Sequence, residues 1–169
     1  LSKLENGLRK KEKEFGNIMK SGRTHLMDAL PIRLGQEFKA YAEIIRKDIK
    51  HIKEDSDSLR ELNLGGTAIG TGVNASKEYI KITIKEINKY TKLKFGKARD
   101  LIEATSNLSA ILRTSSSLKN LAVDLIKIAN DLRLLNSGPN TGINEISLPS
   151  IQPGSSIMPG KVNPVVAEM

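Results

Sequence analysis

The chain has 169 residues, two histidines, no cysteine and a formal net charge of +8. This length is sufficient for one domain with a sizeable core, whereas the lack of cysteine excludes a disulfide framework and a thiolate metal site. No apolar run is long enough to span a bilayer and no secretory signal follows Leu1, so we expect a cytoplasmic protein without a membrane partner.

The first half of the chain is expected to be helical around one extended loop. Hydrophobic spacing predicts a helix over residues 1–20, and glycine and proline predict an extended loop over 22–31. A long helix should begin near Leu34, with an apolar stripe that continues to the glycine- and threonine-rich turn at 65–72.

In the second half, Asn74 or Ser76 can cap another helix. After a linker over 92–100, a long helix is predicted over 104–135. A short β-prone piece at 143–148 and the first turn of a helix at 165–169 complete the chain. The predicted fold class is therefore all-α, an elongated bundle of long helices with short extended loop segments. The apolar faces of these helices are too wide to be covered within one chain, which predicts self-association.

The positive charge is mixed with acidic residues rather than gathered on one face. Mixed signs at helical spacing are typical of a solvated helix face, and His51 lies on such a helix without any motif around it. A nucleic-acid surface would need a one-sided basic patch with aromatic residues, which make up only 4% of the chain. We therefore expect no nucleic-acid partner, and expect the excess charge to attract a small anionic substrate.

The loop over residues 152–164 has the composition of an anion site. Its glycines allow positive φ and close approach to a ligand, and its prolines fix the turns. Lys161 offers a positive charge, Asn163 an amide, and Ser155 and Ser156 two hydroxyls. The alternative is an ordinary surface turn between two helices.

The loop string, Gln-Pro-Gly-Ser-Ser-Ile-Met-Pro-Gly-Lys-Val-Asn-Pro, resembles the signature of the fumarase/aspartase superfamily. Residues 21–38, 65–74 and 127–139 resemble other conserved blocks of that superfamily. The resemblance implies that residues 1–169 are the central helical domain, without the N-terminal and C-terminal domains of the parent enzyme. It also implies a homotetramer with active sites shared between subunits. A block rich in Ser, Thr and Asn that helps to hold the substrate is missing, so we expect this fragment alone to be inactive.

Members of this superfamily remove a proton beside a carboxylate and expel a leaving group from the next carbon. The doubly charged aci-carboxylate that forms needs positive charge and hydrogen-bond donors. The resemblance implies three catalytic residues: Ser155 as the base, and His25 with Glu168 as its paired acid. Substrate binding is then assigned to Thr24, His25, Ser156, Lys161 and Asn163. The residues alone do not distinguish Ser155 from Ser156, because a serine alkoxide needs strong stabilisation that Lys161 and backbone N–H groups could give to either.

Within the superfamily, the loop and the Gly-Gln-Glu-Phe block favour aspartases and fumarases over argininosuccinate and adenylosuccinate lyases. The stretches 100–105, 130–135, 144–146 and 164–166 resemble aspartases. The implied reaction is the reversible elimination of ammonia from L-aspartate to give fumarate, without an organic cofactor and with divalent-metal activation left open. Alternatives are a class II fumarase and a non-catalytic helical interaction fragment. Retention of Thr24, His25, Ser155, Lys161 and Asn163 disfavours the latter.

Overall fold

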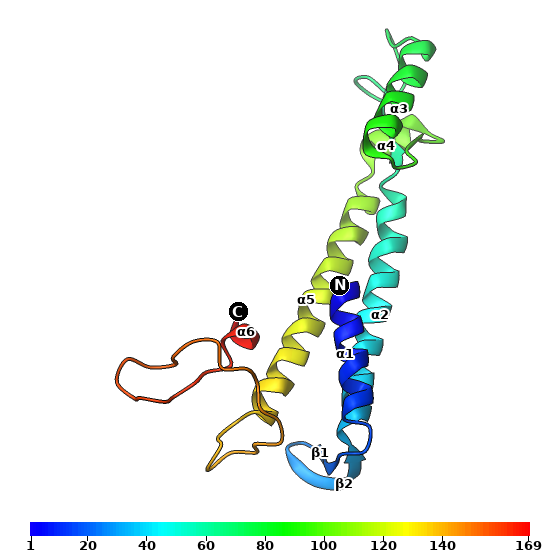
Figure 1. Ribbon diagram of the computed structural model, residues 1–169. Coiled ribbons are helices and arrows are strands. Elements are labelled where there is room, and N and C mark those ends of the chain that lie inside the picture. Colours follow the sequence, from blue (N-terminus) through cyan, green and yellow to red (C-terminus); the bar gives the residue numbers. More distant parts are fainter. The chain divides into compact units, whose positions relative to one another are not determined.

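A computed structural model describes all residues from Leu1 to Met169. The chain is mainly helical, as predicted, and adds two small two-stranded sheets (Figure 1). It divides into two compact units, one made of residues 1–47 and 120–169 and the other of residues 48–119. None of the helices combines the length and the apolar character that a membrane crossing needs.

The first unit is organised around the beginning of α2 (Leu34–Ser58), where the long helix was predicted. Helix α1 (Ser2–Glu14) packs against it: Arg9 pairs with Glu43, and the rings of Phe15 and Phe38 meet edge to face with centroids 5.2 Å apart. The end of α5 (Ser109–Leu135) also belongs to this unit. Its buried apolar side chains are Leu8, Leu34, Phe38, Tyr41, Ala42, Ile45, Ile128 and Leu135.

Helix α1 is shorter than predicted. It ends at Glu14 rather than near Lys20, because the carbonyls of Phe15 and Ile18 accept hydrogen bonds from the N–H groups of Gly35 and Leu34. These bonds, of 3.0 and 2.9 Å, hold the two ends of the intervening segment together. Tertiary hydrogen bonding has therefore overridden the helical spacing of Ile18 and its neighbours.

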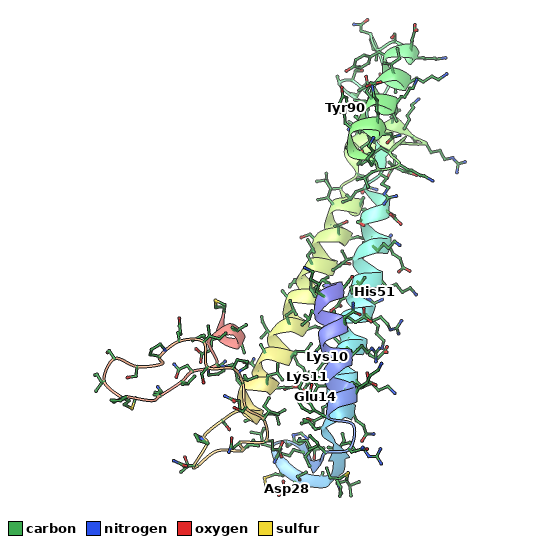
Figure 2. All side chains as sticks on the ribbon, viewed as in Figure 1. Lys10, Lys11, Glu14, Asp28, His51 and Tyr90 are labelled. Atoms are coloured by element: carbon green, nitrogen blue, oxygen red, sulfur yellow. The ribbon has the colours of Figure 1, made fainter.

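The predicted extended loop is a β-hairpin. Strand β1 (Met19–Thr24) pairs antiparallel with β2 (Met27–Arg33), and the register is irregular between Ser21 and Arg23. Thr24 lies opposite Met27, which leaves His25 and Leu26 as a two-residue turn. Figure 2 labels Asp28 on this hairpin, where its carboxylate accepts a hydrogen bond of 2.9 Å from the Ser21 hydroxyl.

The second unit contains α3 (Lys77–Thr91), α4 (Leu101–Ser106) and a parallel pair of short strands, β3 (Glu61–Leu62) and β4 (Gly96–Lys97). Strand β4 falls within the predicted linker. The predicted turn at residues 65–72 is present, and Gly65, Gly70 and Gly72 have positive φ. Ser76 rather than Asn74 caps α3, since its hydroxyl accepts a hydrogen bond of 3.0 Å from the N–H of Tyr79.

The helix predicted over residues 104–135 is two helices, α4 and α5, that are separated at Asn107. Residue Asn107 has an extended backbone, and its side-chain oxygen accepts hydrogen bonds from the N–H (2.8 Å) and hydroxyl (2.6 Å) of Ser109. Short polar side chains favour such local bonds over a continuous helix. Asn107 thereby caps the start of α5.

No strand forms at residues 143–148, where a β-prone piece was predicted. The N–H groups of Glu145 and Ile146 donate instead to the carbonyl of Leu135, and that of Leu148 donates to the Asn136 side chain. This segment satisfies the otherwise free carbonyl at the end of α5. Helix α6 (Val165–Glu168) follows the loop at 152–164 and matches the predicted first helical turn.

Helix α5 exposes a set of large apolar side chains. Leu112 is 67% exposed and Ile126 60% exposed, and Ile111, Leu118 and Val123 are also more than half exposed. Such side chains at helical spacing are characteristic of a helix that packs against a partner. By contrast, His51 extends from the exposed side of α2 (Figure 2), in agreement with its predicted surface role.

Candidate active site

The segment from Gln152 to Pro164 is a closed loop. Pro153 and Val162 form an antiparallel bridge, and the N–H of Gly154 donates to the carbonyl of Lys161 over 2.8 Å. A further bond of 3.3 Å joins the N–H of Lys161 to the carbonyl of Met158. The backbone therefore fixes Ser155 and Lys161 at the two sides of one narrow loop, which we call the Ser155 loop (residues 152–164).

Close approach at the base of the Ser155 loop requires glycine at position 154. A Cβ atom on Gly154 would lie 2.6 Å from the side-chain oxygen of Asn163 and 2.9 Å from its backbone nitrogen. The amide of Asn163 also lies 3.5 Å from the carbonyl of Gly154, as a long hydrogen bond. Asn163 is thus held against the backbone next to Ser155.

The two serines of the loop differ in their hydrogen bonding. The Ser155 Oγ accepts from the backbone N–H groups of Ile157 and Met158, each over 3.2 Å. Ser156 is exposed and its hydroxyl has no comparable partner. Two donors directed at one oxygen stabilise negative charge on it, which is the requirement for a serine base. The residue types alone did not show this difference between the hydrogen bonds of Ser155 and Ser156.

Lys161 is exposed and has no ionic partner within the chain. Together with Asn163 it lines a cavity of about 490 Å³, which also includes Arg133 and Asn136 from the end of α5. The carboxylate of Glu168 lies 3.9 Å from the Arg133 guanidinium. A free ammonium and an amide beside an open cavity are suited to a carboxylate ligand.

Thr24 and His25 lie at the turn of the hairpin, and both are exposed. His25 and Leu26 have φ of 53° and 63°, in the left-handed region that a two-residue hairpin turn demands. Such turns usually contain Asn or Gly, so the conformation is costly for His and Leu. The turn residues His25 and Leu26 line a second cavity, of about 440 Å³.

Charged residues gather around this second cavity. The Lys20 Nζ lies 2.8 Å from a Glu37 oxygen and 3.0 Å from a Glu145 oxygen, and Arg23 donates to Glu145 over 2.7 Å. Sequence reasoning assigned no role to these four residues. Only an indirect indication of their importance was present in the sequence. Three of them lie in or next to the block at 21–38, and Glu145 lies in a stretch that resembles aspartases.

An aromatic and an acidic side chain, those of Tyr41 and Asp131, also line this second cavity. The Tyr41 hydroxyl donates to Asp131 over 3.0 Å, and Lys127 also pairs with that carboxylate. Burial, followed by the negative charge of Asp131, raises the pKa of Tyr41 well above its ordinary value. Tyr41 therefore stays protonated and acts as a fixed hydrogen-bond donor.

One chain brings together only part of the predicted site. Ser155, Ser156, Lys161 and Asn163 share the Ser155 loop, whereas His25 lines the other cavity and Thr24 lies next to it in the hairpin. Glu168 lies beside Arg133, and no hydrogen bond or ion pair joins it to His25. The predicted site residues of one chain therefore fall into two separate groups. The side chains of His, Cys, Asp and Glu form no group of three or more that could hold a metal ion.

Comparison with known proteins gives consistent matches along the whole chain. Residues 1–169 match a protein family described as Lyase. The aspartate ammonia-lyase of Bacillus subtilis is 52% identical over 166 residues, which cover 98% of this chain and 35% of that protein. The aspartate ammonia-lyase of Escherichia coli is 50% identical over 169 residues, covering 100% of this chain and 35% of that protein. The chain thus spans about a third of the length of these relatives.

Solved structures confirm the fold class. A class II fumarase from Schistosoma mansoni superimposes with a TM-score of 0.94 at 37% identity, covering 98% of this chain and 38% of that one. A structure described as fumarate lyase:delta crystallin from Brucella melitensis, bound to cobalt, gives a TM-score of 0.91 at 49% identity, covering 98% and 36%. With every residue inside the family match and the fold shared, the chain belongs to the lyase family of the fumarase/aspartase superfamily.

Proposed function

We propose that the full-length protein is an aspartate ammonia-lyase, which eliminates ammonia reversibly from L-aspartate to give fumarate. The observation that carries this proposal is the identity of about 50% with aspartate ammonia-lyases along the whole chain. An intact Ser155 loop supports it, since a vestigial site would have lost at least one functional side chain. The same relationship underlies our proposal of a cytoplasmic enzyme that needs no organic cofactor.

In the proposed mechanism, Ser155 removes a proton from the carbon next to one substrate carboxylate. The electron pair of that C–H bond moves into the carboxylate, which becomes a doubly charged aci-carboxylate. Its collapse forms the carbon–carbon double bond and breaks the bond to the amino nitrogen, and ammonia departs. The proton on Ser155 then passes to solvent, which restores the base.

The side chains around this reaction have separate proposed roles. Lys161 and Asn163 hold the carboxylate where the charge develops, because an exposed ammonium without an intramolecular partner is free to bind an anion. Ser156 adds a hydroxyl to the same substrate. Thr24 and His25 bind from another subunit, and Glu168 pairs with His25 in the assembled protein.

We further propose a homotetramer in which residues 1–169 form the central helical domain. Two observations support it: the exposed apolar side chains of α5, and the separation of Thr24 and His25 from the Ser155 loop within one chain. Burying each exposed Leu or Ile side chain contributes roughly 1.5–3 kcal/mol. Association would therefore both stabilise the helices and complete the site.

A second candidate is class II fumarase activity, which is favoured by the TM-score of 0.94 with the Schistosoma mansoni enzyme. Purified full-length protein can be assayed with L-aspartate and with L-malate, following fumarate by its ultraviolet absorbance. We expect fumarate from aspartate, and release at least about a hundredfold slower from the Ser155→Ala variant. Faster release from malate under matched conditions would establish the fumarase instead, and turnover of neither substrate would refute both.

A further inference from the structure

Four charged side chains form a half-buried network that the proposed reaction does not use directly. Lys20, Arg23, Glu37 and Glu145, here called the ion cluster, are joined by contacts of 2.7–3.0 Å. The Lys20 side chain is only 6% exposed, and the other three are 18–22% exposed. Two cations face two carboxylates, so the charges balance inside the cluster.

The ion cluster links three segments that are distant in the sequence. Lys20 and Arg23 lie on β1, Glu37 lies in the first turns of α2, and Glu145 lies between α5 and the Ser155 loop. Arg23 directly precedes Thr24, the last residue before the His25 turn. The contact from Arg23 to Glu145 therefore ties one predicted substrate-binding segment to the chain that leads into the other.

Glu145 is fixed through both its backbone and its side chain. Its N–H donates to the carbonyl of Leu135 over 2.8 Å, while its carboxylate forms ion pairs with Arg23 (2.7 Å) and Lys20 (3.0 Å). Burial raises the pKa of the Glu145 carboxyl, but the hydrogen bonds and charges of Arg23 and Lys20 outweigh this effect and hold the net pKa below its ordinary value. Glu145 is consequently ionised in the neutral pH range.

Stability alone is a poor explanation for such a cluster. Partly buried ion pairs lose hydration, and apolar side chains of similar volume are often as stabilising. One oxygen of Glu37 and one oxygen of Glu145 are buried without a hydrogen-bond partner, so the cluster is not even fully satisfied. The Arg23 guanidinium donates to one oxygen of Glu145 over 2.7 Å, and a charge-assisted hydrogen bond of this kind fixes the distance between the two side chains. Arg23 lies two positions before His25, whose φ is 53°.

We propose that Glu145 and Arg23 are positioning residues. They hold Thr24 and His25, at the tip of the hairpin, in the geometry that binds substrate. This inference rests on the proposed function, because it assigns Thr24 and His25 to the substrate. Neither Glu145 nor Arg23 touches the reacting atoms in this scheme. They act through the hairpin, and a displacement of the order of 1 Å at a binding group lowers the rate by about a hundredfold.

The test uses the full-length oligomer and a double-mutant cycle of Glu145→Gln and Arg23→Gln. Each single variant should lower kcat/KM for aspartate by about ten- to a hundredfold, measured well below its Tm. The kcat/KM of the double variant should be no lower than that of the less active single variant, since each substitution removes the same contact between Arg23 and Glu145. Glu43→Gln is the matched control, because Glu43, like Glu145, bridges two cations, in this case Arg9 and Arg46, yet lines neither cavity. We expect its kcat/KM to be unchanged.

A lowered Tm with normal kcat/KM in Glu145→Gln would show a merely structural role and overturn the inference. Losses that multiply in the double variant would overturn it as well. Amide hydrogen exchange without substrate gives a readout that does not depend on activity: residues 24–26 should exchange faster in Glu145→Gln but not in Glu43→Gln. If the wild-type protein fails to turn over aspartate, the proposed function is wrong, and exchange alone then decides whether Glu145 orders the turn. Unchanged exchange there would refute it.

Discussion

Replacing Ser155 with alanine should separate the proposed catalysis from folding. The Ser155 Oγ accepts two backbone hydrogen bonds of 3.2 Å, from Ile157 and Met158. Ile157 is 87% and Met158 52% exposed, so water can replace the lost oxygen as an acceptor. The free energy of unfolding should therefore change by at most about 1 kcal/mol.

The same two bonds have a larger effect on the charged form of the serine. A hydrogen bond to a neutral acceptor contributes about 0.5–1.5 kcal/mol, and one to a charged acceptor about 1.5–3 kcal/mol. Two donors therefore favour the alkoxide over the hydroxyl by about 2–3 kcal/mol, a factor of about 30–150. Because serine is a very weak acid, the remainder must come from positive charge such as that of Lys161.

The assay is steady-state formation of fumarate from aspartate by full-length Ser155→Ala, with Ser156→Ala as the matched control. Loss of a positioned base should lower kcat by about a hundredfold to ten-thousandfold, and Ser156→Ala should be much milder. Tetramer content and Tm should match the wild type in both. Equal losses in the two variants, or normal turnover in Ser155→Ala, would refute the separate roles argued from the hydrogen bonds.

Three further predictions concern geometry, pH and capping. Gly154→Ala should lower kcat/KM about tenfold or more, because a Cβ there lies 2.6 Å from the Asn163 side-chain oxygen, whereas Gly7→Ala, which meets no atom within 4 Å, should leave kinetics unchanged. As the pKa of Glu145 is held below 4.5, the unfolding free energy should decrease as pH falls below about 4.5, and Glu145→Gln should flatten this part of a pH series of urea titrations. Asn107→Ala should cost about 1 kcal/mol in urea unfolding through loss of the α5 cap, and an unchanged midpoint would contradict the capping argument.

Helices and turns were predictable from the sequence where one local signal dominated. The start of α2 at Leu34 and the Gly65–Gly72 turn follow from hydrophobic spacing and from glycine, and both are present. The hairpin at 19–33 was predicted only as an extended loop, since its pairing depends on contacts across the turn rather than on alternation. The division at Asn107 depends on two hydrogen bonds to one side-chain oxygen, which leave no trace in an otherwise continuous helical pattern.

In the candidate site, too, local features were predictable from the sequence and features that depend on the folded backbone were not. The residue types of the Ser155 loop were sufficient to predict an anion site, because Lys161, Asn163 and the serines lie close in sequence. The acceptor role of Ser155 Oγ depends on the φ and ψ angles of the loop, which composition does not determine. Arg23 and Glu145 are 122 positions apart, and only the folded chain shows that they are paired.

The positive charges beside the Ser155 loop of one chain are fewer than the proposed chemistry requires. Lys161 is the one cation on the loop, and Arg133 in the same cavity already lies 3.9 Å from Glu168. An aci-carboxylate with two negative charges needs more compensation than one exposed ammonium supplies, because exposed charges are strongly screened by water. A second subunit that contributes His25 and its hairpin would add donors and exclude solvent, which strengthens every charge interaction in the site. Pairing of Glu168 with that His25 would also release Arg133 toward the cavity, so assembly would raise the positive charge available to the substrate.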